Sequence, residues 1–375
     1  MALEETFGPW LDALRAGAGG FELFDAHTHI GRHDPDGFKQ TPAELVAGLD
    51  ACGSRALVFP MNEPDGYGDG VANDEALAAA HEHPDRLFAF CRVDPNAGDA
   101  AVAEARRCLD AGARGIKLHP RAQRFTMSHP LVRELVVLAH ERALPVLVHA
   151  GRDIPALGAD TVRLSAEFPA ASLILAHAAI SDLAWLWREL PAHPNLYVDT
   201  AWWNPVDVVA LFTLAPPGQV LWASDSPYGL PTVAAVQGLR CAVQAGLTPE
   251  GLRGAAGGQL ARLVAGEAPL DLGPAPRSPR ALDPLLERVV SYLATTIGRA
   301  FAGADYAETL ALARLACAVG DDAETGAVCA AVLELLDLFE EHLAPPVDDR
   351  PLPEAGRFLI SAMYVARTPA AALPE

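Results

Sequence analysis

The chain has 375 residues and a formal net charge of −20 at pH 7. Its composition, 51% hydrophobic and 20% charged residues, is typical of a globular rather than a disordered protein. This negative charge argues against nucleic acid and anionic membranes as partners, since both favour clustered Lys and Arg, and it leaves a small molecule as the expected partner. The sequence has no run of about 18 apolar residues and opens with acidic side chains, so we expect neither a membrane span nor a secretion signal.

Eight short apolar runs recur along the chain, with helical patterns between them. Runs rich in Val, Ile, Leu and Phe that alternate with helices are typical of βα units and a parallel sheet. The runs lie at residues 21–27, 55–60, 87–93, 114–119, 144–150, 171–177, 195–200 and 219–225. Eight successive units predict an α/β fold, a (β/α)8 TIM barrel, and an open doubly wound sheet is the competing architecture.

Two helices between the runs have clear local signals. Thr41 can cap a helix that begins at Pro42, because a hydroxyl accepts from the first turn and proline suits the first helical position. Residues 128–142 place Leu131, Leu135 and Leu138 on one face with a period of 3.6 residues. Both segments are expected to cover the outside of the sheet.

The C-terminal third differs in composition from the barrel region. Residues 266–284 are rich in proline, which neither a helix interior nor a central strand tolerates. We therefore predict a barrel over residues 1–265, a linker over residues 266–284 and a C-terminal helical appendage over residues 285–375. The appendage is expected to pack on the barrel or on a second subunit, which would make a homodimer. Six cysteines without CxxC spacing indicate reduced thiols in a cytoplasmic protein.

The end of the first run, Asp25-Ala26-His27-Thr28-His29, is the strongest chemical signal. Residues two apart on a strand point to the same face, so His27 and His29 can bind one metal ion. Asp25 either holds a ligating histidine or caps a loop. A lone His-x-His pair also occurs by chance, and the argument needs further residues.

Polar residues end three other runs, at His149, His177 and Asp225. The carboxyl ends of barrel strands form the face that carries barrel active sites. Each residue alone could be a strand-end side chain bonded to a loop. Four aligned positions from four strands favour convergence on one site.

With these residues the sequence resembles the metal-dependent amidohydrolase superfamily, in the branch that includes aminocarboxymuconate semialdehyde decarboxylase and related lactone hydrolases. The segments DAHTHIG, GIKLHP, VLVHAG, LILAHAA and ASDSP carry the resemblance over about residues 21–265, whereas GQLARL departs from the family's Asn-Ala-x-x-Leu pattern. The resemblance implies one divalent metal ion, usually zinc, with His177 as a catalytic residue beside it. The implied ligands are His27, His29, His149 and Asp225.

The implied chemistry begins with a water molecule whose pKa the metal lowers. Asp225 would take the proton and later deliver it to the leaving group, and His177 would polarise the scissile carbonyl. In binuclear relatives a lysine of the fourth strand is carbamylated and bridges two metals, whereas the branch that GIKLHP resembles is usually mononuclear.

Four further residues are candidate substrate contacts. Lys117 lies inside an apolar strand, where an ammonium needs an anion, a modification or a lowered pKa, and we expect it to contact a substrate carboxylate or carbonyl. Arg121 either adds a second positive contact or is a solvated loop residue, and His119 is equally open. Trp202 and Trp203 either offer a flat apolar wall to an aromatic substrate or pack under a loop.

These features predict a metal-dependent hydrolase that uses a metal-activated water to cleave a C–O or C–N bond in a small, carboxylated, cyclic or aromatic substrate. Non-oxidative decarboxylation at the same metal site is the alternative reaction. A hypothesis from another class is a catalytically silent, metal-stabilised scaffold whose C-terminal helices form an interaction module. The acidic net charge disfavours a nuclease.

Overall fold

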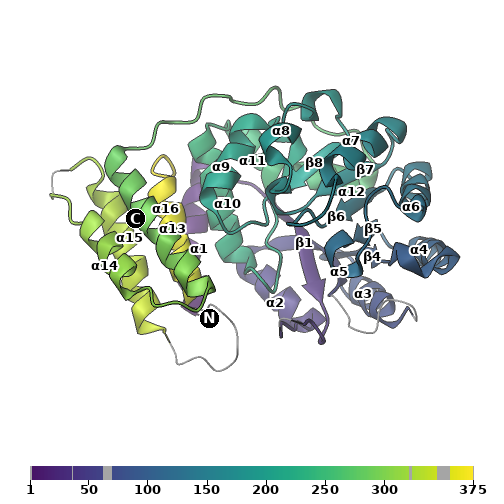
Figure 1. Ribbon diagram of the computed structural model, residues 1–375, viewed down its shortest axis with the longest axis horizontal. Coiled ribbons are helices and arrows are strands. Elements are labelled where there is room, and N and C mark those ends of the chain that lie inside the picture. Colours follow the sequence, from purple (N-terminus) through teal and green to yellow (C-terminus); the bar gives the residue numbers. More distant parts are fainter. Residues whose placement is uncertain (1, 36, 62–69, 321–322, 344–354, 375) are drawn as a thin grey trace.

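The computed structural model describes residues 2–35, 37–61, 70–320, 323–343 and 355–374, and its strands form a barrel surrounded by helices (Figure 1). All strand pairs between named strands are parallel. In chain order the strands are β1 (Leu23–Ile30), β2 (Ser54–Pro60), β3 (Leu87–Ala89), β4 (Cys91–Arg92), β5 (Ile116–Leu118), β6 (Pro145–Val148), β7 (Ser172–Leu175), β8 (Leu196–Asp199) and β9 (Val220–Leu221). Each strand pairs with its neighbours in sequence, in the orders β1-β2-β3 and β4-β5-β6-β7-β8-β9.

Backbone hydrogen bonds join these two sheets into one closed barrel. The predicted third strand is split at Phe90 into β3 and β4, and the Phe90 N–H donates to Val58 O at 2.9 Å. At the other seam the Ala26 N–H donates to Trp222 O at 3.1 Å, and the His29 N–H donates to Ser226 O at 2.8 Å. The prediction of a (β/α)8 barrel is confirmed, and the open sheet is excluded.

The strands are short and apolar because side chains bury both of their faces. Alternate residues point inward, where Phe59, Leu147, Ile174 and Leu221 belong to one buried cluster, while their neighbours face the surrounding helices. The barrel interior is therefore largely a packed apolar core, into which a few buried polar side chains such as His27 and Lys117 are set.

The helices between the strands cover this barrel. Thr41 caps α2 as predicted, because Thr41 Oγ1 accepts from the Glu44 N–H at 3.2 Å and Glu44 Oε2 accepts from the Thr41 N–H at 2.8 Å. The predicted helix at 128–142 is α6, which buries Leu135 and Leu138. The barrel helices are α2 (Pro42–Cys52), α3 (Val71–Glu82), α4 (Asp99–Asp110), α5 (Pro120–Gln123), α6 (Pro130–Glu141), α7 (Leu157–Glu167), α8 (Leu183–Leu186), α9 (Pro205–Leu214), α10 (Pro231–Ala245), α11 (Pro249–Arg253) and α12 (Gln259–Ala265).

An N-terminal helix, α1 (Ala2–Ala18), precedes the first strand and was not predicted from the sequence. Its apolar residues Phe7, Leu11 and Leu14 follow helical spacing and are buried. α1 packs against α10, and the Phe7 ring stacks on Phe358 with centroids 6.1 Å apart. Helix α1 thus links the barrel to the C-terminal helices.

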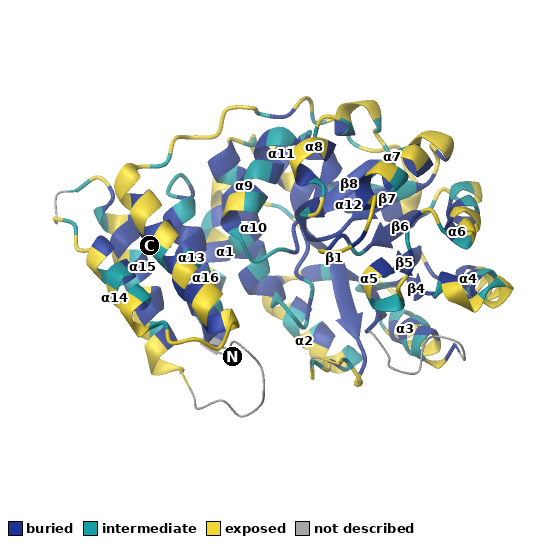
Figure 2. Ribbon diagram, in the orientation of Figure 1, coloured by how far each residue is buried: buried dark blue, intermediate teal, exposed yellow. Residues whose placement is uncertain are grey.

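Four helices follow the barrel: α13 (Pro284–Phe301), α14 (Ala307–Ala316), α15 (Gly326–Glu341) and α16 (Gly356–Arg367). Residues 266–283, all of them described, contain neither helix nor strand. The helices stand beside the barrel, and α16 packs between α13 and α15 on one side and α9 and α10 on the other (Figure 1). Figure 2 shows that the faces of α13 and α16 turned toward their neighbours are buried. Within the described part of the chain, no helix is both long and apolar enough to cross a membrane.

Candidate metal centre and pocket

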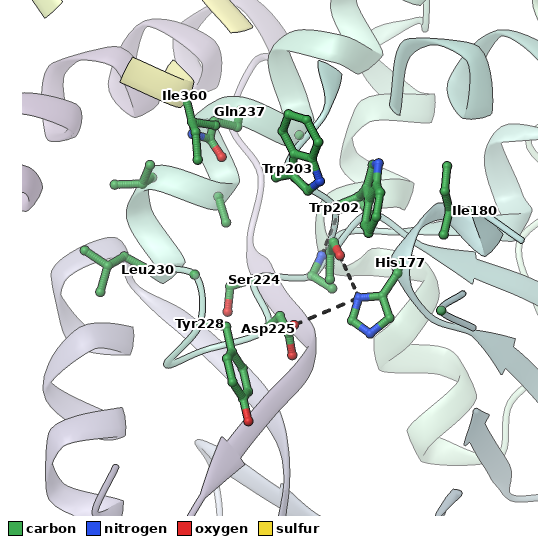
Figure 3. A pocket seen from close by; sticks show the side chains of 18 of the residues that line it. His177, Ile180, Trp202, Trp203, Ser224, Asp225, Tyr228, Leu230, Gln237 and Ile360 are labelled. Carbon is green, nitrogen blue, oxygen red and sulfur yellow. Dashed lines mark hydrogen bonds and ion pairs between the residues drawn. The ribbon is translucent and has the colours of Figure 1, made fainter. Parts of the chain in front are cut away.

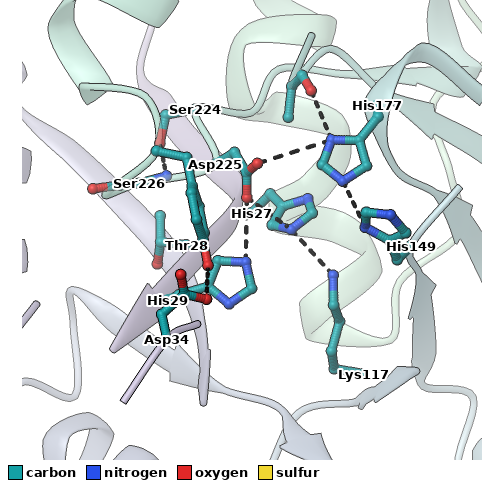
Figure 4. Close-up of polar contacts among 12 residues, drawn as sticks. His27, Thr28, His29, Asp34, Lys117, His149, His177, Ser224, Asp225 and Ser226 are labelled. Atoms are coloured by element: carbon teal, nitrogen blue, oxygen red, sulfur yellow. Dashed lines mark hydrogen bonds and ion pairs between the residues drawn. The ribbon is translucent and has the colours of Figure 1, made fainter. Parts of the chain in front are cut away.

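Two imidazoles and one carboxylate meet where β1 and β9 end (Figure 4). His27 Nε2 and His29 Nε2 each lie 3.2 Å from Asp225 Oδ1. The ligand atoms of these three side chains all lie within 4.8 Å of one another. The structure therefore brings together three of the four predicted metal ligands.

Hydrogen bonds at the far side of each ring indicate where the protons of His27 and His29 lie. His27 Nδ1 lies 2.9 Å from Asp199 Oδ2, and His29 Nδ1 lies 3.4 Å from Pro60 O. Since a carboxylate and a carbonyl only accept, both Nδ1 atoms carry the proton and both Nε2 atoms offer lone pairs. Burial and the Lys117 charge hold the pKa of both histidines well below its usual range, so the rings are neutral.

Two imidazole lone pairs therefore face the same carboxylate oxygen. The Lys117 Nζ lies 3.1 Å from one of these lone pairs, that of His27, while the lone pair of His29 faces Asp225 without a cation among the described residues. Neutral imidazole with carboxylate is a donor set that suits Zn2+. The residues present thus fit a divalent metal ion.

Asp199 was not predicted, although it is the best-connected polar residue below the metal centre. Its Oδ2 accepts from His27 Nδ1, and its Oδ1 accepts from the N–H groups of His177 at 2.8 Å and Ala201 at 3.0 Å. Burial raises the pKa of Asp199 to about 7. The signal that could have found it is the one used for Asp225, a carboxylate at the end of an apolar strand.

Asp25 proves to cap a loop. Its Oδ1 accepts from the backbone N–H groups of His27 at 3.0 Å and Ser224 at 2.9 Å, and its side chain makes no bond with either imidazole. Burial raises the pKa of Asp25 to about 7. Asp25 thus ties β1 to the loop after β9, while Asp199 holds the His27 ring.

His149 and His177 form a second pair of rings beside this group. His177 Nδ1 donates to Ala201 O at 2.8 Å, so the 2.9 Å contact from His149 Nδ1 to His177 Nε2 is donated by His149. His149 Nε2 is buried without a hydrogen-bond partner among the described residues. His149 therefore lies outside the three-residue group, and its role as a fourth ligand stays a prediction. Its ring stacks on His119, with centroids 3.8 Å apart.

Lys117 lies beneath the metal centre. Its Nζ is 3.1 Å from His27 Nε2 and 4.5 Å from the centre of the Phe59 ring. Lys117 is fully buried, and this burial lowers its pKa to about 7. It does not line the pocket described next, and its role as a substrate contact stays a prediction.

Asp225 and His177 form the floor of a pocket of about 720 Å³ (Figure 3). Asp225 is 22% exposed in its side chain because it faces this space, and burial still raises its pKa to about 6. The predicted substrate contacts Trp202, Trp203 and Arg121 all line the pocket, with Arg121 exposed to solvent. The indole of Trp202 is fixed by a 2.8 Å bond from Nε1 to Asp207 Oδ2.

The fold and this site define a class: a (β/α)8-barrel enzyme with a histidine- and aspartate-lined centre at the carboxyl ends of its strands. The family model described as Amidohydrolase matches residues 24–258. The chain therefore belongs to the amidohydrolase family, which is part of a superfamily of metal-dependent enzymes. The resemblance inferred from the sequence motifs is confirmed.

Solved structures agree on the fold. An uncharacterised TIM-barrel protein from Bordetella bronchiseptica is 14% identical, and the match covers 66% of this chain and 99% of that protein with a TM-score of 0.53. 5-Carboxyvanillate decarboxylase from Sphingomonas paucimobilis is 16% identical, with 66% of this chain and 99% of that protein covered and a TM-score of 0.52. 2,6-Dihydroxybenzoate decarboxylase from Rhizobium is 15% identical, with 65% of this chain and 99% of that protein covered and a TM-score of 0.52. No curated protein matches the chain significantly.

Proposed function

We propose that this chain is a metal-dependent hydrolase that cleaves a C–O or C–N bond in a small, carboxylated, cyclic or aromatic molecule. The observation that carries the proposal is the pair of Nε2 lone pairs, on His27 and His29, aimed at one oxygen of Asp225. These three residues would hold the ion, with His149 as the proposed fourth ligand. Zinc is the proposed metal, because neutral imidazoles and a carboxylate are its usual nitrogen and oxygen ligands. A bound divalent cation supplies a Lewis acid that lowers the pKa of water toward neutrality.

Asp225 is the proposed proton carrier. Its carboxylate lies beside both imidazoles and faces the pocket, where it can accept a proton from water and return it to a leaving group. Its partial exposure to the pocket gives the substrate access to it.

His177 contributes through Nε2. Because Ala201 O holds the proton on Nδ1, Nε2 carries the lone pair, which accepts from the Nδ1–H of His149 at 2.9 Å. Polarisation of a carbonyl, the role implied by the family resemblance, would require the imidazolium form, which burial disfavours by lowering the pKa of His177. We therefore propose that His177 positions the ring of His149, whose Nε2, unpartnered among the described residues, is left to bind the ion.

The proposed substrate class follows from the pocket lining. Trp202 and Trp203 present flat apolar faces, and Arg121 at the rim offers a cation to a carboxylate. The buried, unpaired state of all six cysteines supports a cytoplasmic location for this activity.

The test measures turnover of lactones, amides and carboxylated arenes by the zinc-loaded chain, in water enriched in 18O. We expect incorporation of one 18O atom into product, and a loss of about 10² to 10⁴ in kcat for Asp225→Asn. Asp182→Asn, a half-buried aspartate that does not line the pocket, is the matched control and should keep full activity.

Decarboxylation at the same centre is the second candidate. Two similar structures are decarboxylases of carboxylated arenes by name, and Asp225, which faces the pocket, could deliver a proton to carbon. Release of CO2 without incorporation of 18O would replace the hydrolase proposal with this one.

A further inference from the structure

The pocket above Asp225 has a wall that does not come from the barrel. Phe301 at the end of α13 and Arg357, Ile360 and Tyr364 on α16 line it together with barrel residues. The family match ends at residue 258, so all four side chains belong to the part of the chain that the family model leaves unmatched. The C-terminal helices therefore contribute to the same cavity as the metal centre.

Hydrogen bonds fix α16 to both loops that frame this cavity. Arg357 Nη2 donates to Pro227 O at 3.1 Å and to Tyr228 O at 3.2 Å, just after Asp225. The hydroxyl of Tyr364 donates to Trp202 O at 2.7 Å, on the loop after β8. The position of the wall is thus set relative to the reacting groups rather than left to loose packing.

The space beside this wall is apolar and extends away from the metal centre. The rings of Trp203 and Phe301 meet edge to face, with centroids 5.6 Å apart, and Leu230 and Ile360 line the pocket further along. In Figure 3 Ile360 and Gln237 lie at the opposite end of the pocket from His177. A volume of about 720 Å³ is in the range that holds drug-sized ligands and exceeds what a single carboxylated ring fills.

We propose that the substrate carries an apolar arm, an alkyl or aryl chain, which lies against Trp203, Phe301 and Ile360, and that the two helical residues set the length of arm the enzyme accepts. This proposal rests on the proposed function, which places the reaction at the end of the pocket that contains Asp225. The helices thereby act as the specificity wall of the site.

The test is calorimetric titration of the full-length, zinc-loaded chain with benzoate and with 4-ethyl-, 4-butyl- and 4-hexylbenzoate. Each buried methylene should tighten binding about fourfold until the arm reaches α16. Ile360→Trp should remove this gain for the butyl and hexyl ligands while leaving benzoate affinity unchanged, which also shows that the variant is folded. Phe301→Ala should weaken binding of the longer ligands about tenfold or more.

Leu285→Ala is the matched control, since Leu285 is a 42% exposed residue of the same helix that lies outside the pocket, against 41% for Phe301. It should bind every ligand as the wild type does. Affinity that is independent of arm length, absence of binding by the whole series, or an unchanged profile in Ile360→Trp would each overturn the proposal. Turnover without dependence on arm length would leave the hydrolase proposal intact, whereas length-dependent binding with no turnover of any substrate would leave only the specificity wall.

Discussion

Replacing Asp199 with Asn tests how the metal centre is held. An asparagine can keep Oδ1 as the acceptor for the N–H groups of His177 and Ala201, so the backbone around β8 should retain both bonds. The side that faces His27 Nδ1 at 2.9 Å then carries an NH2 group, which cannot accept. His27 would move its proton to Nε2 and lose the lone pair that a metal needs.

The expected size of this effect follows from comparable partners of metal-binding histidines, whose removal lowers metal affinity about 10- to 100-fold. This range corresponds to about 1.4 to 2.8 kcal/mol of binding free energy. Stability should fall less than for removal of the whole side chain, because two of the three hydrogen bonds remain.

The assay is competition for Zn2+ between the protein and a chromogenic chelator, which reports affinity without any need for a substrate. Asp182→Asn is the control, because its carboxylate accepts from Ser181 Oγ and touches none of the metal-centre residues in the described structure. A zinc affinity for Asp199→Asn within twofold of the wild type would refute the assignment of the His27 proton to Nδ1.

Three other predictions concern stability. Zn2+ at about 100 times its dissociation constant should stabilise the wild type by about 2.7 kcal/mol and raise its Tm by about 3 °C in a thermal scan. The same Zn2+ concentration should change neither quantity in His29→Ala. Equal shifts in both proteins would show that the ion binds elsewhere. Arg240→Ala should lower the urea-derived free energy of unfolding by about 3 kcal/mol, because it removes the hydrogen bonds to Thr368 Oγ1, Thr368 O and Ala372 O. Arg253→Ala, which removes one bond from an exposed side chain to Ala18 O, should lower it by less than about 1 kcal/mol. Similar losses in the two variants would contradict the docking role of Arg240. Gly257→Ala should lower the free energy of unfolding by about 1 to 3 kcal/mol, because the added Cβ would lie 2.7 Å from Phe24 N and 2.8 Å from Glu22 O. In Gly298→Ala the added Cβ meets no atom within 4 Å, so this control should leave the free energy of unfolding unchanged or raise it.

The fold could be predicted because its signals are local and repeated. Each strand is a short apolar run, and helix starts such as Thr41 carry their own capping chemistry. The interruption at Phe90 gave no such signal, because the run 87–93 is continuously apolar up to Arg92 and predicts one strand. Helix α1 could have been predicted from the helical spacing of Phe7, Leu11 and Leu14, which lies within an opening segment that also contains acidic residues.

The site could be predicted only as far as strand ends indicate convergence. His27, His29 and Asp225 meet because β1 and β9 are adjacent at the barrel seam, a consequence of closure. The depth of each side chain is not written in the sequence: Lys117 and Arg121 are four residues apart, yet one is fully buried and the other is exposed. The contribution of Ile360 and Phe301 to the pocket could not be predicted either, since it depends on how helices more than 70 residues from Asp225 in sequence dock on the barrel.

The turn after β7 holds three consecutive residues in the left-handed region, His177 at φ 57°, Ala178 at 54° and Ala179 at 48°. For residues with a Cβ this conformation costs about 1 to 2 kcal/mol each, and a glycine at 178 or 179 would remove most of that cost. Glycine would also allow the turn to adopt other backbone conformations, and the orientation of the His177 ring would change with them. The two alanines therefore cost folding free energy, and in exchange they restrict the backbone that carries the His177 imidazole to one conformation.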